Sequence, residues 1–192
     1  MKNFRILAGI CGIVAPILVF SLIFYAIGSA PWFSWNRNAL SDLGVGDTAP
    51  IFNSALIAGG LLLFIFSIGL RQTLPRGALS LLGTILLSLG MLVLSGIGLF
   101  PETAGRIHLY LSVAFFTLLS LSFLLIGVSD LRQQKSRASG MLTILTGLLV
   151  ALIWALHWSI RLGGVAVPET ISALLGSAWA IAKGVKLIQS SI

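Results

Sequence analysis

Charged residues and cysteine are what this sequence has least of. Only 9% of its 192 residues are charged, and Cys11 is its single cysteine. Soluble domains carry about a quarter charged residues, so a soluble globular protein is excluded. One cysteine also excludes an internal disulfide and a cysteine-based zinc cluster. Because Cys11 lies inside an apolar run, we expect it to pack within a helix.

The sequence also lacks the pattern of a nucleic-acid binder. Its net charge is +7, but no basic run with interleaved aromatic residues is present. Nucleic-acid-binding surfaces need such a clustered basic patch. In a membrane protein, a surplus of Lys and Arg is typical of the cytoplasmic segments. We therefore expect membrane lipids, and no nucleic acid, as partners.

Long apolar runs dominate what is present. Hydrophobic residues make up 57% of the chain, and the mean hydropathy is +1.06. Runs of about twenty apolar residues match the ~30 Å hydrocarbon core of a bilayer. The sequence predicts an all-α membrane protein, a six-transmembrane-helix bundle forming one integral membrane domain over 1–192, with an outer loop at 30–50. The predicted helices lie near 6–29, 51–70, 78–99, 108–128, 140–161 and 170–187.

The first apolar run predicts a helix that stays in the protein. It follows a positively charged start, as a signal peptide does. It is, however, longer than the ~7–15-residue apolar region of a cleaved signal. We therefore expect an uncleaved first transmembrane helix.

The distribution of charge predicts an orientation. An even number of helices places both termini on one side. If that side is cytoplasmic, the inner segments hold nine of the 12 Lys and Arg residues, Lys183 among them, and Asp130 is the one inner acid of five. This is the positive-inside pattern. We expect a multi-pass protein of the plasma membrane with both termini cytoplasmic.

Polar residues gather on the predicted outer side. In the loop, Trp32 and Trp35 suit the headgroup layer. Asn38 and Asp42 fall one turn apart if 38–43 forms a short helix. Asn53, just inside the second helix, faces back toward this loop.

Two further segments bring ionisable groups to the same side. Glu102 and Arg106 are four residues apart, which favours a pair across one helical turn. His108 begins the fourth helix, with Ser112 one turn deeper. The fifth helix gathers on one face Trp154, His157, Trp158 and Arg161. Ionisable groups at membrane depth mark functional sites that face the bundle interior.

Two short repeats open the fourth and sixth helices, Pro101-Glu102-Thr103 and Pro168-Glu169-Thr170. Proline in a first turn followed by an acid suits a helix N-terminus. The match has two explanations, convergent capping and an internal duplication, with capping favoured.

We predict a polar pocket at the extracytoplasmic membrane face. Its candidate binding residues are Arg37, Asn38, Ser41, Asp42, Asn53, Glu102, Arg106, His108, His157 and Arg161.

Three functions are open for this pocket. The favoured one is binding of a lipid headgroup, a small solute or a membrane-protein partner, with the arginines contacting phosphate or carboxylate. A second is a zinc-dependent membrane hydrolase acting on a lipid, in which His108, His157 and either Asp42 or Glu102 hold the metal and leave a position for water. No HExxH or similarly spaced motif supports it. The third is a b-type haem held by the two histidines. Whether the protein is an enzyme, and its oligomeric state, are not decided by the sequence.

The run Phe33-Ser34-Trp35-Asn36-Arg37-Asn38-Ala39-Leu40-Ser41-Asp42-Leu43-Gly44 resembles the pattern of a known family. Ile51-Phe52-Asn53 and Leu99-Phe100-Pro101-Glu102 with His108 fit the same pattern. The family is an uncharacterised archaeal and bacterial membrane protein family, catalogued as domain of unknown function 998. The resemblance spans nearly the whole chain and implies a six-helix membrane protein with no established activity. It supports the choice of Asn38, Ser41, Asp42, Asn53, Glu102 and His108. His157 is not matched to it and rests on its depth and helical face.

Overall fold

The computed structural model describes residues 2–132, 137–160 and 163–191, and in this part of the chain the regular secondary structure is all helical. Six long helices are each long and apolar enough to cross a membrane. They are α1 (Lys2–Gly28), α2 (Ala49–Arg71), α3 (Ala78–Leu99), α4 (Arg106–Arg132), α5 (Arg137–Ile160) and α6 (Ala166–Gln189). Three short 3-10 helices lie between them, η1 (Leu40–Gly44), η2 (Gly46–Thr48) and η3 (Glu102–Ala104). The predicted all-α, six-helix fold class is confirmed.

The predicted helix limits differ from the observed ones mainly by a turn at the ends. The third helix matches its prediction, 78–99. The sixth begins at Ala166 rather than at 170, and the fourth extends from Arg106 to Arg132. Polar residues at these ends interrupt the apolar run but continue the helix. The predicted end of the fifth helix, 161, lies outside the described residues.

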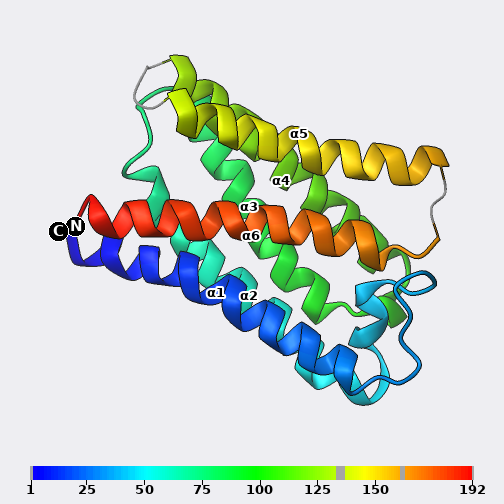
Figure 1. Cartoon of the computed structure of the whole chain (residues 1–192). Coiled ribbons are helices and arrows are strands. Elements are labelled where there is room, and N and C mark those ends of the chain that lie inside the picture. The colour runs from blue at the N-terminus through cyan, green and yellow to red at the C-terminus, as the bar shows by residue number, and fades with distance from the viewer. Residues whose placement is uncertain (1, 133–136, 161–162, 192) are drawn as a thin grey trace.

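The helices follow one another around the bundle in chain order. Each of α1 to α5 packs against the next, and α6 packs against both α5 and α1. Both termini lie at one end of the bundle (Figure 1), as an even number of crossings requires. We call this the termini end. The opposite end, which carries residues 30–48, η3 and the α5–α6 connection, is the loop end.

Glycines bring helices into backbone contact near the termini end. A Cβ atom on Gly184 of α6 would lie 2.7 Å from the Gly9 carbonyl oxygen of α1. One on Gly127 of α4 would lie 2.9 Å from the Gly140 carbonyl oxygen of α5. Small residues allow this close approach within membranes. Both helix pairs separate toward the loop end (Figure 1), and this divergence leaves room for cavities there.

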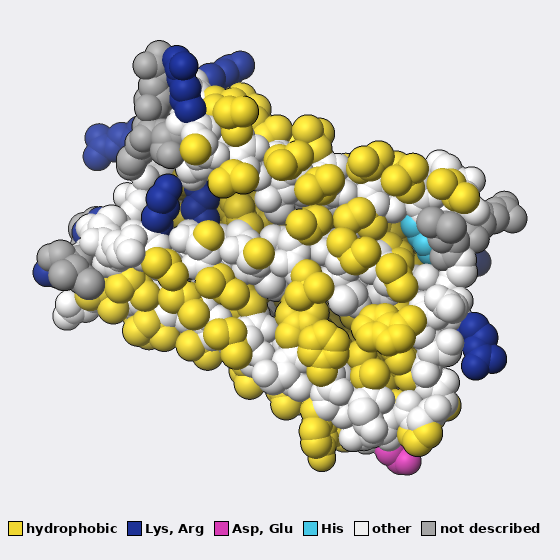
Figure 2. Space-filling model, viewed as in Figure 1, with side chains coloured by type: hydrophobic (Ala, Val, Ile, Leu, Met, Phe, Trp, Pro, Cys, Tyr) yellow, Lys and Arg dark blue, Asp and Glu magenta, His cyan; other side chains and the backbone are white. Residues whose placement is uncertain are grey.

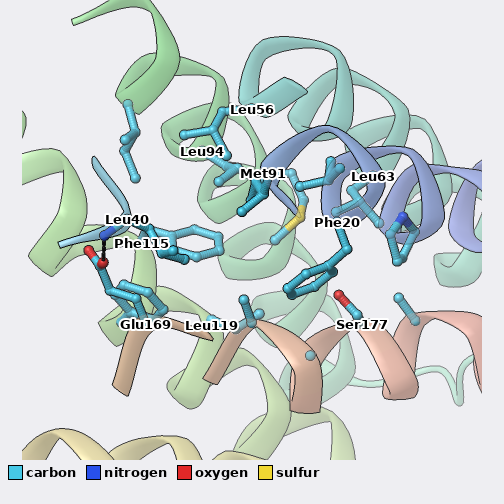
Figure 3. Close-up of a pocket in the computed structure, with 18 of the residues that line it drawn as sticks. Phe20, Leu40, Leu56, Leu63, Met91, Leu94, Phe115, Leu119, Glu169 and Ser177 are labelled. Atoms are coloured by element: carbon cyan, nitrogen blue, oxygen red, sulfur yellow. Dashed lines mark hydrogen bonds between the residues drawn. The ribbon is translucent and has the colours of Figure 1, made fainter. Parts of the chain in front are cut away.

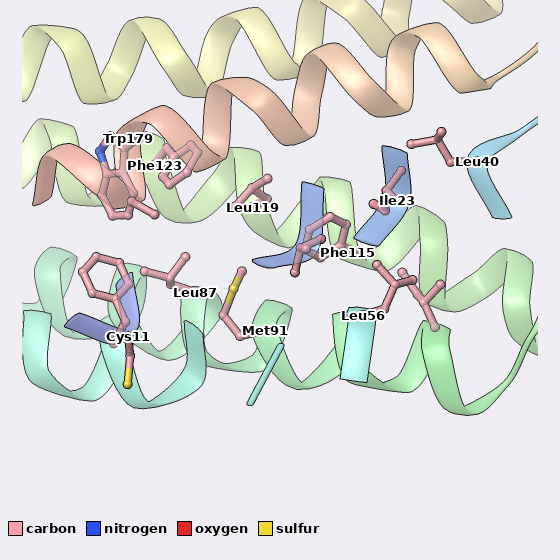
Figure 4. Packing of buried hydrophobic residues seen from close by; sticks show 14 of the residues in the cluster. Cys11, Ile23, Leu40, Leu56, Leu87, Met91, Phe115, Leu119, Phe123 and Trp179 are labelled. Atoms are coloured by element: carbon pink, nitrogen blue, oxygen red, sulfur yellow. The ribbon is translucent and has the colours of Figure 1, made fainter. Parts of the chain in front are cut away.

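Aromatic and aliphatic side chains fill the bundle between these contacts. The Trp179 ring centroid lies 4.5 Å from that of Phe123 and 6.2 Å from that of Phe66. Leu87 and Met91 of α3 lie in the same buried cluster (Figure 4). On the visible face, Lys and Arg gather mostly at the termini end and apolar side chains cover the middle (Figure 2). This is the surface expected of a membrane bundle.

Candidate functional site

A hydrogen-bonded turn begins the loop that covers the loop end. The Asn38 side-chain amide donates to Asp42 Oδ2 at 2.6 Å, and the Ala39 N–H donates to the same oxygen at 3.1 Å. Asn38 Oδ1 accepts from the Ser34 N–H at 2.9 Å. Asn38 and Asp42 lie on the same side, as predicted, but the short helix expected over 38–43 is a 3-10 helix over Leu40–Gly44. Asn38 precedes this helix.

Asn53 ties this loop to α2. Its side-chain amide donates to the Gly44 carbonyl oxygen at 3.0 Å. The Thr48 hydroxyl donates to the Leu43 carbonyl oxygen at 2.8 Å, and Leu43 is fully buried. Asn53 does face back to the loop, as predicted, but there it anchors the backbone.

The same loop is also fixed to the α5–α6 connection. The Gly164 N–H donates to the Asn36 carbonyl oxygen at 2.7 Å, and the Ala166 N–H donates to that of Asn38 at 2.9 Å. Gly163 has a φ of +48°, which favours glycine. A Cβ atom on Gly164 would lie 2.6 Å from the Asn38 carbonyl oxygen. The glycine pair therefore permits the docking of residues 36–38.

Three carboxyl groups meet beneath this loop. Glu169 Oε2 of α6 accepts a hydrogen bond of 2.6 Å from the Leu40 N–H (Figure 3). The Glu102 and Asp42 carboxyl groups lie close enough to interact electrostatically. Partial burial and this interaction with Asp42 together raise the pKa of Glu102 to about 7. Glu169 interacts electrostatically with both.

Sequence reasoning placed Glu169 outside the site. The repeated Pro-Glu-Thr pattern could have found it, but capping was the simpler explanation. Glu102 does not cap α4: it lies in η3, and Gly105, with a φ of +60°, separates η3 from the start of α4 at Arg106. The predicted Glu102–Arg106 pair is wrong for the same reason. Glu102 contacts Asp42, and the Arg106 side chain is exposed.

His108 lies in the first turn of α4 and is 7% exposed. Its Nδ1 lies 2.8 Å from the Phe100 carbonyl oxygen. A carbonyl oxygen only accepts, so Nδ1 carries the hydrogen, and Nε2 of the neutral ring is an acceptor. The Phe100 carbonyl therefore fixes the tautomer of His108.

A pocket of about 630 Å³ extends from this site along α4 and α5. We call it the lateral pocket. At its deep end lies Ser120, whose hydroxyl donates to the Gly147 carbonyl oxygen at 2.8 Å. This hydrogen bond links α4 to α5. Its lining residues come from the loop, η3, α4, α5 and the start of α6: Ala39, Ser41, Glu102, Gly105, His108, Leu109, Ser112, Val113, Phe116, Thr117, Ser120, Leu121, Val150, Ala151, Trp154, Trp158, Val165 and Glu169.

A smaller apolar cavity of about 120 Å³ lies inside the bundle, between α1, α2, α3, α4 and α6. Figure 3 shows Phe20, Met91 and Phe115 around it. Its lining includes Ser41 and Glu169, which also line the lateral pocket. Glu169 therefore stands where the two cavities meet.

His157 lies elsewhere. It lines a third groove with Trp35 and Asn36, is 8% exposed, and its Nδ1 has no hydrogen-bond partner. Trp154 and Trp158, from the same predicted face, line the lateral pocket instead. Across residues 2–132, 137–160 and 163–191, no group of three or more His, Cys, Asp or Glu side chains could hold a metal ion. The geometry does not support a zinc site or a haem shared by His108 and His157.

Two of the three arginines of the predicted site do not line the lateral pocket. Arg37 and Arg106 have exposed side chains, and neither is among the pocket residues. Arg161 lies outside the described residues. Ser41, Glu102 and His108 line the pocket together, and Asn38, Asp42 and Asn53 hold the loop above it.

Comparison with known proteins identifies the family of this chain, but that family has no known function. No curated protein and no solved structure matches the chain. One family model, described as protein of unknown function (DUF998), matches residues 13–186 and so extends from α1 to α6. The family expected from the run 33–44 is therefore confirmed: the chain belongs to the DUF998 family, whose function is unknown.

Proposed function

We propose that this protein binds a membrane amphiphile, with the polar headgroup at the carboxyl cluster and the apolar chain in the lateral pocket. The observation that carries the proposal is the polarity of this pocket. Ser41, Glu102, His108, Ser112 and Glu169 line its loop end. Except for the hydroxyls of Thr117 and Ser120 and the indoles of Trp154 and Trp158, the other side chains of the lining are apolar. Ligand sites are mostly apolar with a few convergent polar groups.

The dimensions of the pocket fit an amphiphile from one leaflet. The twelve residue-to-residue steps from His108 to Ser120 correspond to about 18 Å along α4. One leaflet contributes about half of the ~30 Å hydrocarbon core. Exposed apolar side chains, Leu109, Val113 and Leu121, form the rim of the pocket along α4. A lipid chain could therefore enter sideways from the bilayer.

The loop end is proposed to be extracytoplasmic, in the plasma membrane. The excess of Lys and Arg in the segments at the termini end supports this through the positive-inside rule. The amphiphile would then come from the outer leaflet.

Cysteine labelling tests the orientation. In cells, a membrane-impermeant maleimide should label Asp47→Cys, which is exposed at the loop end, and should not label Ser190→Cys at the termini end. Cys11 is buried and gives little background. The reverse labelling pattern would show that the pocket opens in the inner leaflet.

A pair of alanines on α5 tests amphiphile binding. Ala151 lines the lateral pocket, whereas Ala155, one turn further, does not, and both are exposed. Ala151→Trp should fill the pocket and reduce co-purifying lipid about tenfold, as measured by mass spectrometry of protein in nanodiscs. Ala155→Trp should retain the wild-type amount. Equal lipid retention in both variants would contradict the proposal.

A further inference from the structure

We propose that the headgroup bound in the lateral pocket is a protonated amine, so that the ligand is a cationic amphiphile. This inference rests on the proposed function, since it names the chemical class of ligand for the same pocket.

The polar end of the pocket presents hydrogen-bond acceptors. Glu102 and Glu169 offer carboxyl oxygens, and Glu169 uses only one of its two for the Leu40 N–H. His108 offers Nε2 as an acceptor, because its Nδ1–H is engaged by the Phe100 carbonyl oxygen. A primary ammonium group supplies three N–H donors and a positive charge to such a site.

Polar atoms at this end also have unused bonding capacity. Ser41 lines both cavities and forms no hydrogen bond in the part of the chain that the structure describes. His108 lines the lateral pocket, and its Nε2 has no partner among the described residues. Both residues are 7% exposed, but these two atoms are not fully enclosed, so they are accessible to a ligand in the pocket.

The surroundings select against an anionic headgroup. Among residues 2–132, 137–160 and 163–191, no lysine or arginine lines the pocket. A phosphate or carboxylate would face Glu102 and Glu169, and such like-charge contacts are a common means of rejecting a ligand. The Phe116 and Trp154 rings, whose centroids lie 4.6 Å apart, line the pocket just beyond, and aromatic faces attract cations. Trp154 Nε1 is a buried donor without a partner, which suits an acceptor oxygen next to the amine.

Four small probes test the headgroup class. We expect purified protein in phosphatidylcholine nanodiscs to bind radiolabelled hexadecylamine saturably. Hexadecanoic acid and hexadecyl phosphate should compete at least about tenfold more weakly, and butylamine, which lacks the chain, should not compete. Glu102→Gln or Glu169→Gln should weaken hexadecylamine binding about ten- to a hundredfold, the range for a lost charge-assisted hydrogen bond.

A control variant and three possible outcomes show whether the headgroup class, the amphiphile or both are wrong. Asp47→Asn removes an exposed acid of the loop that does not line the pocket, and it should bind hexadecylamine as the wild type does. If the anionic probes bind more tightly than the amine and Ala151→Trp blocks them, the amine headgroup is refuted while amphiphile binding stands. If butylamine binds as tightly as hexadecylamine, the ligand is a soluble amine. If no probe responds to Ala151→Trp, both proposals fail.

Discussion

Replacing Lys183 by methionine should destabilise the protein by about 3–5 kcal/mol, the usual cost of leaving a buried charge unpaired. Lys183 of α6 is 9% exposed. Its Nζ donates to Asp130 Oδ2 of α4 at 3.1 Å and to Ser139 Oγ of α5 at 2.9 Å. It also lies 5.7 Å from the Trp179 ring centroid. The ammonium group therefore joins three helices at the termini end, and among the described residues it is the one ion-pair partner of Asp130.

A double variant distinguishes the ion pair from simple packing. Lys183→Met combined with Asp130→Leu removes both charges, and apolar replacement of a whole buried pair is often neutral or stabilising. We expect the double variant to recover most of the lost free energy of unfolding, measured by titration with sodium dodecyl sulfate in mixed micelles. Lys186→Met, an exposed lysine one turn later, should change stability by less than about 0.5 kcal/mol. A Lys183→Met variant as stable as Lys186→Met would contradict the assignment.

The six-helix fold could be predicted from the sequence because it depends on the number and length of the apolar runs. Apolar runs of membrane-spanning length, separated by short polar segments, define six helices without any knowledge of their contacts. The proximity of Asn38 and Asp42 could be predicted because the two residues are only four positions apart, although Asn38 precedes η1 rather than lying in it.

The long-range part of the site could not be predicted, because helix rotation is not encoded in such uniformly apolar helices. In the sequence, Lys183 and Asp130 count simply as charges of the inner segments. Their pairing depends on which faces of α4 and α6 meet. The same applies to Glu169, which joins Leu40 across 129 positions of sequence, and to His157, which faces a different groove from His108. In each case tertiary packing decides what the pattern leaves open.

The close packing of α2 against α3 has a sharp test in Gly60→Ala. A Cβ atom at this position would lie 2.6 Å from the Met91 carbonyl oxygen and 2.7 Å from the Ser95 amide nitrogen, both in the backbone of α3. The backbone of a helix cannot yield locally, so the two helices must move apart and lose contacts along their length. Ser95 would be disturbed as well, because its hydroxyl donates to the Ile57 carbonyl oxygen of α2 at 3.1 Å.

We expect Gly60→Ala to lower the free energy of unfolding by about 1–3 kcal/mol, the range for overpacking a tight interior. Gly90→Ala is the matched control on α3, because its Cβ would lie 3.5 Å from Leu118 Cβ, an ordinary contact. Alanine favours a helix over glycine by about 1 kcal/mol, so Gly90→Ala should be at least as stable as the wild type. The same detergent titration measures both. The chemical change is the same in both variants, and only the neighbouring atoms differ. If Gly60→Ala and Gly90→Ala have the same free energy of unfolding, the α2–α3 contact is looser than these distances require.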